Sequence, residues 1–206
     1  MSEPLSRRAF FAHSALYSGS LWMLLNAPRP LATRAAQEST RREVLSEAEW
    51  KIIEAITGRI IPADREPGAI EAGCVNFIDK ALAHEDAAMK PVYRAGLLGI
   101  DTVSKRRFAK PFVELAPDQQ DEILAALEAG KAEGWPPGDV SSEKFFETVR
   151  VHTIIGFLAD PKYGGNRDYV GWKVMGYPGP RHHMGGYTAA QMVGKEKIKA
   201  VWGDEI

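Results

Sequence analysis

Hydrophobic positions recur at intervals of three and four residues over most of the chain, a pattern that predicts amphipathic helices. The first predicted helix runs from about Ser46 to Ile61, because Ser46 and Glu49 form a capping box and Pro62 stops the helix. Its inward face is formed by Trp50, Ile52, Ile53, Ile56, Ile60 and Ile61.

Four further helical segments follow. The third covers about 87–107, the fourth runs from Pro117 to Gly130, and the fifth begins at Ser142 and ends before Pro161. The second has its apolar face at Ile70, Cys74, Phe77, Ile78, Ala81 and Leu82. The broad apolar face of the fifth comprises Phe145, Phe146, Val149, His152, Ile155, Gly156 and Leu158. No strand-like alternation occurs, so we predict an all-α fold, a single bundle of about five helices.

The pattern changes in residues 160–180, here called the C-terminal segment, which are rich in glycine, proline and aromatic residues. This composition predicts an irregular segment with at most a short turn near residues 169–173. The tail, residues 181–206, follows it. In the tail only residues 194–206, GKEKIKAVWGDEI, are compatible with a helix.

The start of the chain has a different character. In SRRAFFAHSA, Arg7 and Arg8 lead into Phe10 and Phe11, and a mainly apolar run continues to Ala27. This is the layout of a twin-arginine export signal, although a basic amphipathic N-terminus is the alternative. The run is broken by polar residues and is shorter than a membrane-spanning helix. The twin-arginine route exports folded proteins, usually because a cofactor is inserted first.

Four regions follow from these patterns: a signal region 1–36, a linker 37–45, a helical domain 46–180 and the tail 181–206. The 206 residues, 45% hydrophobic and 26% charged, have a globular composition. Residues 1–45 carry six arginines and three glutamates, while the whole chain has a net charge of −1. The rest of the chain is therefore mildly acidic, which argues against nucleic acid as a partner.

Motifs that would hold a redox cofactor are absent from the sequence. It has no glycine-rich dinucleotide fingerprint, phosphate loop, Cys-x-x-Cys-His haem motif or His-Glu-x-x-His metal motif. Cys74 is the single cysteine, which excludes an internal disulfide and a cysteine-based metal cluster. We expect Cys74 to be a small buried hydrophobic residue, with a bridge to another chain as the alternative. The sequence thus predicts no cofactor in this chain.

Histidines and carboxylates offer few catalytic arrangements. His152 lies among apolar residues of the fifth helix and is expected to be a hydrogen-bonded core histidine. His182 and His183 are adjacent, so a metal site there needs ligands from elsewhere. Three carboxylates show no acid–base pairing and are interpreted as solvated charge: Asp64, Glu66 and Asp79.

Two stretches together resemble a known family. They are RIIPADREPGAIEAGCVNFIDKALA at residues 59–83, here motif A, and DPKYGGNRDYVGWKVMGYPG at residues 160–179, here motif B. They are similar to the two signature regions of the gluconate 2-dehydrogenase subunit 3 family. The resemblance implies a small helical subunit of a periplasmic flavin-dependent dehydrogenase that acts on a sugar, polyol or sugar acid. The FAD then belongs to a large catalytic subunit of the glucose-methanol-choline type, often accompanied by a cytochrome c subunit carrying haem c.

The family has no known catalytic residue in this subunit. The resemblance therefore implies a non-catalytic chain that supplies the export signal, escorts the folded catalytic subunit through the twin-arginine translocase and stabilises it in the periplasm. Large aromatics in a glycine-rich surface segment suit partner contacts, or they cover the end of the bundle. The candidate interface residues are Tyr163, Asn166, Tyr169, Trp172 and Tyr177.

Two other hypotheses remain open. One is a self-sufficient exported metal-binding protein or enzyme that uses His152, His182 and His183. The other is a free-standing module that binds a small molecule between its helices, which would require an apolar pocket.

Overall fold

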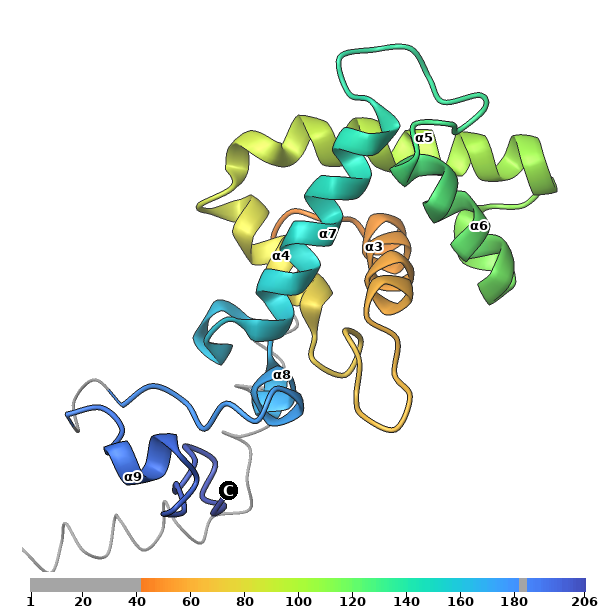
Figure 1. Ribbon diagram of the computed structural model, residues 1–206. Helices are drawn as coiled ribbons and strands as arrows, with labels where there is room; N and C mark the ends of the chain where they lie inside the picture. Colours follow the sequence, from red (N-terminus) through yellow and green to blue (C-terminus); the bar gives the residue numbers. More distant parts are fainter. Residues whose placement is uncertain (1–41, 182–184) are drawn as a thin grey trace, which may run out of the picture. The chain divides into compact units, whose positions relative to one another are not determined.

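Seven α-helices and no β-strand are found in the part of the chain that the computed structural model describes, residues 42–181 and 185–206 (Figure 1). Arg42–Ile206 forms one compact unit. The α-helices are α3 (Glu47–Ile60), α4 (Cys74–Ala83), α5 (Lys90–Phe108), α6 (Pro117–Glu128), α7 (Ser142–Leu158), α8 (Val170–Val174) and α9 (Ala189–Met192). Four 3₁₀ turns lie between them: η1 (Ala87–Met89), η2 (Phe112–Glu114), η3 (Pro161–Tyr163) and η4 (Arg167–Tyr169). The predicted all-α fold is confirmed, and α3 to α7 match the predicted bundle of about five helices.

The helix boundaries follow local capping signals. The side chain of Ser46 accepts a hydrogen bond from Glu49 N at 3.3 Å, and Ser46 N donates to Glu49 Oε2 at 2.8 Å, so the predicted capping box is present. Helix α7 begins at Ser142, as predicted. The residue before it, Ser141, is the N-cap, and its side-chain oxygen accepts a hydrogen bond from Lys144 N. Among the described residues, no helix has the length and apolar character needed to cross a membrane.

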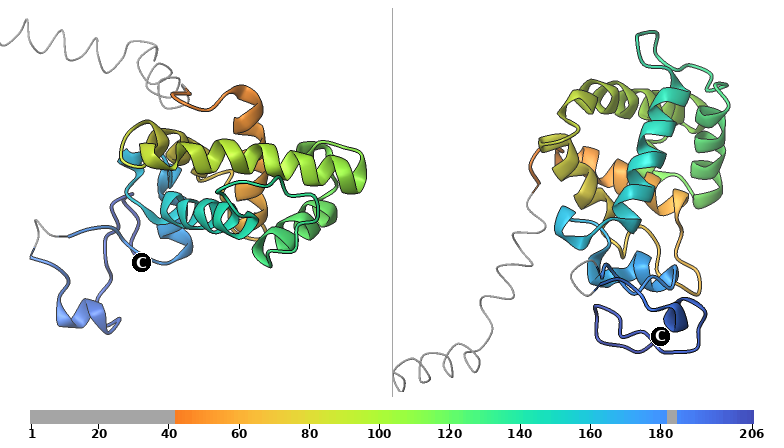
Figure 2. Two further views of the ribbon diagram at one scale, coloured as in Figure 1. Left: turned by 90° about the horizontal axis from the view of Figure 1, so that it is seen from above. Right: turned by 60° about the vertical axis from the view of Figure 1, so that its left-hand side comes forward.

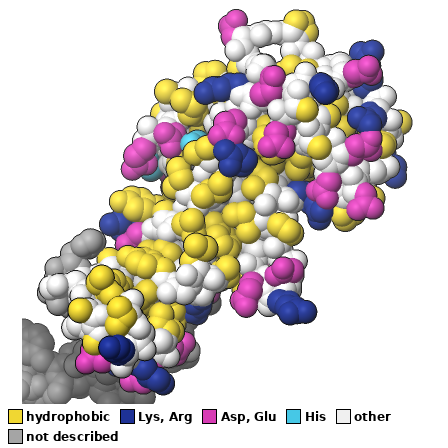
Figure 3. All heavy atoms as spheres, viewed as in Figure 1, with side chains coloured by type: hydrophobic (Ala, Val, Ile, Leu, Met, Phe, Trp, Pro, Cys, Tyr) yellow, Lys and Arg dark blue, Asp and Glu magenta, His cyan; other side chains and the backbone are white. Residues whose placement is uncertain are grey.

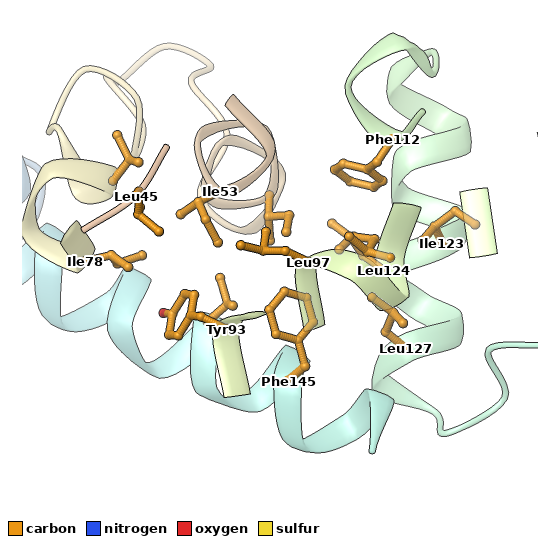
Figure 4. Close-up of a cluster of buried hydrophobic side chains, with 14 of the residues drawn as sticks. Leu45, Ile53, Ile78, Tyr93, Leu97, Phe112, Ile123, Leu124, Leu127 and Phe145 are labelled. Carbon is orange, nitrogen blue, oxygen red and sulfur yellow. The ribbon is translucent and has the colours of Figure 1, made fainter. Parts of the chain in front are cut away.

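Helix α7 is the central element, because it packs against α3, α4, α5 and α6 as well as α8 (Figures 1 and 2). The core lies between these five bundle helices. Figure 4 shows Ile53 of α3, Ile78 of α4, Leu97 of α5, Leu127 of α6 and Phe145 of α7 converging there. All five side chains are at most 5% exposed, and their removal from water is the main favourable contribution to folding.

Three residues predicted to face inward are exposed. Ile70, 48% exposed, lies in the turn before α4, which begins only at Cys74. Ile155 and Leu158 of α7 are 43% and 37% exposed. The C-terminal half of α7 has apolar residues on all of its faces. The spacing of these residues therefore cannot tell which of them face the core.

Asp79 corrects another expectation. Its side chain is fully buried in α4 rather than solvated, and it accepts hydrogen bonds from the backbone N–H groups of residues 43, 44 and 45 at 2.5, 2.9 and 2.7 Å. A buried carboxylate is tolerated when its oxygens are paired with donors in this way. Asp79 therefore fixes the segment before α3 onto α4.

In the C-terminal segment and the described part of the tail, the α-helices are short: α8 and α9. Helix α8 agrees with the short turn predicted near residues 169–173. Residues 194–206, the part of the tail compatible with a helix, are not helical: Ile198 and Ile206 exchange backbone hydrogen bonds at 2.9 Å, and an isolated antiparallel bridge joins Lys199 and Glu205. The helix of the tail, α9, lies before this stretch. Gly194 and Gly203 adopt positive φ in this stretch, a conformation that favours turns over a continuous helix.

Substitution Asp79→Asn should lower the free energy of unfolding by about 2–4 kcal/mol, because an amide has one acceptor oxygen for three N–H donors and its NH₂ group would face a donor. Urea unfolding followed by circular dichroism measures the change. Asp139→Asn is the control, because Asp139 is exposed in a loop and should shift stability by no more than about 0.5 kcal/mol. Equal midpoints for both variants would contradict this role of Asp79.

Candidate functional site

Motifs A and B lie against each other in the structure, although motif A starts at residue 59 and motif B only at residue 160. Arg167 N of motif B donates to the carbonyl oxygen of Ala72 in motif A at 2.9 Å. Asn76 Nδ2 in α4 donates to the carbonyl oxygen of Gly164 at 2.6 Å. The two stretches that carry the resemblance therefore form one structural unit at the C-terminal end of α7.

Two glycines of motif B allow its backbone to reach the backbone of α7. A Cβ atom on Gly165 would lie 2.1 Å from the carbonyl oxygen of Gly156, and one on Gly171 would lie 1.8 Å from that of Phe157. Both distances are far below any allowed contact, so only glycine fits at either position. The glycine content of the motif thus reflects close packing on α7.

Asn166 completes this attachment and is fully buried, with 0% of its surface exposed. Its Nδ2 donates to the carbonyl oxygen of Ala159 at 2.8 Å, and its Oδ1 accepts from Gly171 N at 2.8 Å. Its backbone N–H donates to the carbonyl oxygen of Gly156 at 2.7 Å, with φ at +45°. Asparagine tolerates this left-handed conformation better than most residues, and the hydrogen bonds offset its cost.

The candidate interface aromatics are split between the interior and the surface. Trp172 is buried, and its Nε1 donates to the carbonyl oxygen of Leu158 at 2.6 Å. Tyr169 packs on Trp172 at 5.5 Å and on Trp202 of the tail at 5.9 Å, while Tyr177 meets Trp172 edge to face at 5.2 Å. Asn166 and Trp172 are therefore buried residues that attach motif B to the end of α7. The interface assignment stays a prediction, and Tyr163 and Tyr177 are the members most open to a partner, at 48% and 40% exposed.

A groove of about 580 Å³ lies between the C-terminal ends of α4 and α7 and turn η3. Its apolar wall is formed by Phe77, Ala81, Ile155, Ala159 and Tyr163. Charged and polar side chains surround this wall: Glu43, Lys80, His84, Glu85, Asp86 and Lys162. Two of these groups are already engaged, since His84 Nε2 lies 3.1 Å from Glu43 Oε2 and the Lys162 ammonium lies 4.9 Å from the ring centre of Tyr163. The groove suits an apolar group more than a multiply charged one.

His152 is buried close to this groove, and both ring nitrogens face polar atoms. Its Nδ1 lies 2.8 Å from the hydroxyl of Tyr93, and its Nε2 lies 3.5 Å from Asp86 Oδ2. Its ring also stacks on Tyr93, 5.7 Å away at an angle of 13°, and meets Phe77 edge to face. Burial lowers the pKa of His152, which the nearby Asp86 carboxylate opposes, and burial raises the pKa of Tyr93. The expectation of a hydrogen-bonded core histidine is confirmed.

Metal and thiol chemistry gains no support from the described residues. Within residues 42–181 and 185–206, no group of three or more His, Cys, Asp or Glu side chains is placed to hold a metal ion. Cys74 is buried, as expected, and burial raises the pKa of its thiol to about 12, so the reactive thiolate is disfavoured. His182 and His183 lie outside the described residues, as do Arg7, Arg8, Phe10 and Phe11 of the export signal.

Sequence reasoning missed the groove and the Tyr93–His152 pair. His152 and Tyr93 are 59 residues apart in the chain and meet only because α5 crosses α7. The buried state of Asn166 was also missed, although its position after two glycines and before a turn was a signal for a structural asparagine.

Comparison with known proteins gives one match. A family described as gluconate 2-dehydrogenase subunit 3 matches residues 47–179, which cover motifs A and B entirely. No curated protein and no solved structure shows significant similarity to the chain.

Substitution Gly171→Ala should lower the free energy of unfolding by about 1–3 kcal/mol, because the new Cβ would force motif B away from Phe157. Urea unfolding measures this loss, and hydrogen exchange should show weaker protection of residues 160–180 than of the bundle. Gly138→Ala is the matched control, because nothing lies within 4 Å of its Cβ position. A Gly171→Ala protein as stable as the control would show that motif B does not depend on this contact.

The lowered pKa of His152 predicts a pH effect on stability. The unfolded chain, in which histidine has a pKa of about 6.5, takes up the proton before the folded chain does. The contribution of neutral His152 is therefore complete above about pH 6.5 and is lost as the pH falls through the lowered folded pKa. Urea unfolding from pH 8 to pH 5 should show a smaller loss for His152→Asn, whose Oδ1 accepts from Tyr93, than for wild type. Parallel curves would refute this assignment.

Proposed function

This chain belongs to the gluconate 2-dehydrogenase subunit 3 family, and we propose that it is the non-catalytic small subunit of a periplasmic flavin-dependent dehydrogenase of the glucose-methanol-choline type. In this proposal the substrate of the complex is a sugar, a polyol or a sugar acid. The large subunit carries the FAD and all of the catalytic residues, and a cytochrome c subunit with haem c receives the electrons. The small subunit carries the complex across the membrane and then stabilises it.

The observation that supports the proposal most directly is the family match over residues 47–179. It covers 133 of the 206 residues, including the whole helical bundle and motif B. Family membership makes the chain a subunit that associates with other subunits of a dehydrogenase complex. The escort role, the identity of the partners and the periplasmic location are the parts that we propose beyond this.

The structural roles of the residues in motif B and of His152 also support a role in assembly. Glycines and Asn166 of motif B are engaged in packing and hydrogen bonding within the chain. His152, the buried histidine of the bundle, is enclosed by Tyr93 and Phe77 and has a weakened capacity to take up a proton. A general base needs a reachable proton-accepting nitrogen near the substrate, and the enclosed ring of His152 does not offer one.

The export signal and the missing cofactor motifs have a common explanation in this proposal. A twin-arginine signal on Arg7 and Arg8 requires a folded cargo, and the flavin is inserted into the large subunit in the cytoplasm. A large subunit that lacks its own signal is then exported because it is bound to this chain. Asp79 fixes residues 43–45, the end of the linker, to the domain that binds the partner.

The test is purification of the tagged full-length chain from the periplasm of its native host. We expect a second, larger chain with a flavin absorbance spectrum to co-purify and to carry the dehydrogenase activity. The double variant Arg7→Lys/Arg8→Lys should remove both chains and the activity from the periplasm, because the paired arginines form the export signal. Absorbance spectra and intact masses of the purified fractions measure both effects.

The control for export is Arg41→Lys/Arg42→Lys, a matched pair of charge-conserving changes at the end of the linker, which should leave export intact. A colourless chain purified alone, or one with metal or turnover of its own, would refute the subunit assignment. It would favour the self-sufficient protein that uses His152, His182 and His183. Normal export of the Arg7→Lys/Arg8→Lys chain would refute the escort role only.

A further inference from the structure

The outer face of α7 carries an apolar stripe formed by Val151, Ile154, Ile155 and Leu158. These residues follow one another at steps of three, one and three, so they lie on one side of the helix. Each of them is between 37% and 43% exposed, while the opposite side of the same turns is buried in the bundle. Figure 3 shows hydrophobic side chains gathered over the C-terminal half of α7 and towards α8.

The stripe lacks charge along its whole length. Residues 151–159, VHTIIGFLA, include no acidic or basic side chain apart from buried His152. Charged groups appear only at its two ends, where Glu147 pairs with Arg150 at 2.7 Å and where Asp160 and Lys162 begin motif B. An apolar centre bordered by charged residues is the anatomy of a protein–protein interface, whereas isolated exposed aliphatic residues are ordinary.

The groove described above adjoins the stripe, because Ile155 belongs to both. Its wall of Phe77, Ala81, Ala159 and Tyr163 offers a recess for one large apolar side chain beside the flat stripe. Interfaces draw much of their binding energy from anchors of this kind, surrounded by polar groups that exclude water. Here Lys80, Glu85 and Asp86 supply the polar surroundings.

We infer that the stripe and its groove bind the large flavin-carrying subunit, through an apolar segment of that subunit with one large side chain seated in the groove. The inference rests on the proposed function, which supplies the partner. Membership of the family implies association with other subunits of a dehydrogenase complex, and stable subunit contacts are large and apolar at their centre. Tyr163, at the edge of the groove, is the candidate interface aromatic that this surface includes.

The test compares two stripe variants, Ile154→Glu and Ile155→Glu, with the control Leu98→Glu. Leu98 is 66% exposed on α5 and lines neither the stripe nor the groove. Each tagged chain is produced in the native host, and the co-purified large subunit is quantified by its flavin absorbance and its mass. For both stripe variants the amount of retained large subunit should fall by about tenfold or more relative to wild type and the control, because the contact would bury a charged carboxylate at its apolar centre.

Folding is checked separately, because a misfolded variant would also lose its partner. All three substitutions are on exposed helix positions, so thermal unfolding midpoints should agree closely with wild type. Carbene labelling of unchanged wild-type protein adds an independent measurement. Labelling of residues 151–158 should fall when the large subunit is bound, and labelling of Leu98 should not.

The outcomes separate this inference from the proposed function. Failure of wild type to retain any flavoprotein would refute the proposed function. Retention of the large subunit by the stripe variants at the wild-type level, or unchanged labelling of residues 151–158, would refute the inference alone. A wild-type chain that forms dimers by itself, and that Ile155→Glu makes monomeric, would assign the stripe to self-association and would also overturn it.

Discussion

The contact of motif B with the backbone of α7 is the constraint on which the C-terminal third of the domain depends. Gly165 and Gly171 lie so close to the carbonyl groups of α7 that no side chain fits between them. At the end of the helix Asn166 donates hydrogen bonds to the carbonyl oxygens of Gly156 and Ala159 and accepts one from Gly171 N. Trp172 lies in the same contact, where Tyr169 and Tyr177 pack on it. Trp202 of the tail packs in turn on Tyr169.

Helix α4 connects this end of the domain to its beginning. Asn76 and Asp79 lie three residues apart on α4, so they share one side of the helix. Asn76 holds motif B through Gly164, and Asp79 holds the segment before α3 through three backbone N–H groups. Buried polar groups of this kind fix where a segment lies more than hydrophobic contacts do, because each needs a partner in a set direction. The short helix α4 thus determines where both motif B and the segment before α3 attach to the bundle.

Because of its central position, α7 contributes both to the core and to the exposed surface. Its inner face builds the core with Phe145 and Val149, and its outer face carries the exposed stripe. The C-terminal half of α7 carries apolar residues on all of its faces, and a helix of that kind is normally buried on all sides. Membership of the gluconate 2-dehydrogenase subunit 3 family implies association with other subunits of a dehydrogenase complex. In the contact inferred above, such a subunit would cover the outer side of α7.

The sequence by itself determined the five bundle helices, the capping box at Ser46, the short turn at α8 and the family, because these depend on local signals and on two dense motifs. It did not determine that Asp79 and Asn166 are buried, because their partners at residues 43–45 and on α7 come from distant parts of the chain. Apolar spacing also placed Ile155 inside, since periodicity marks a hydrophobic face but not what covers it. The tertiary structure decided these points, because burial depends on which elements pack together.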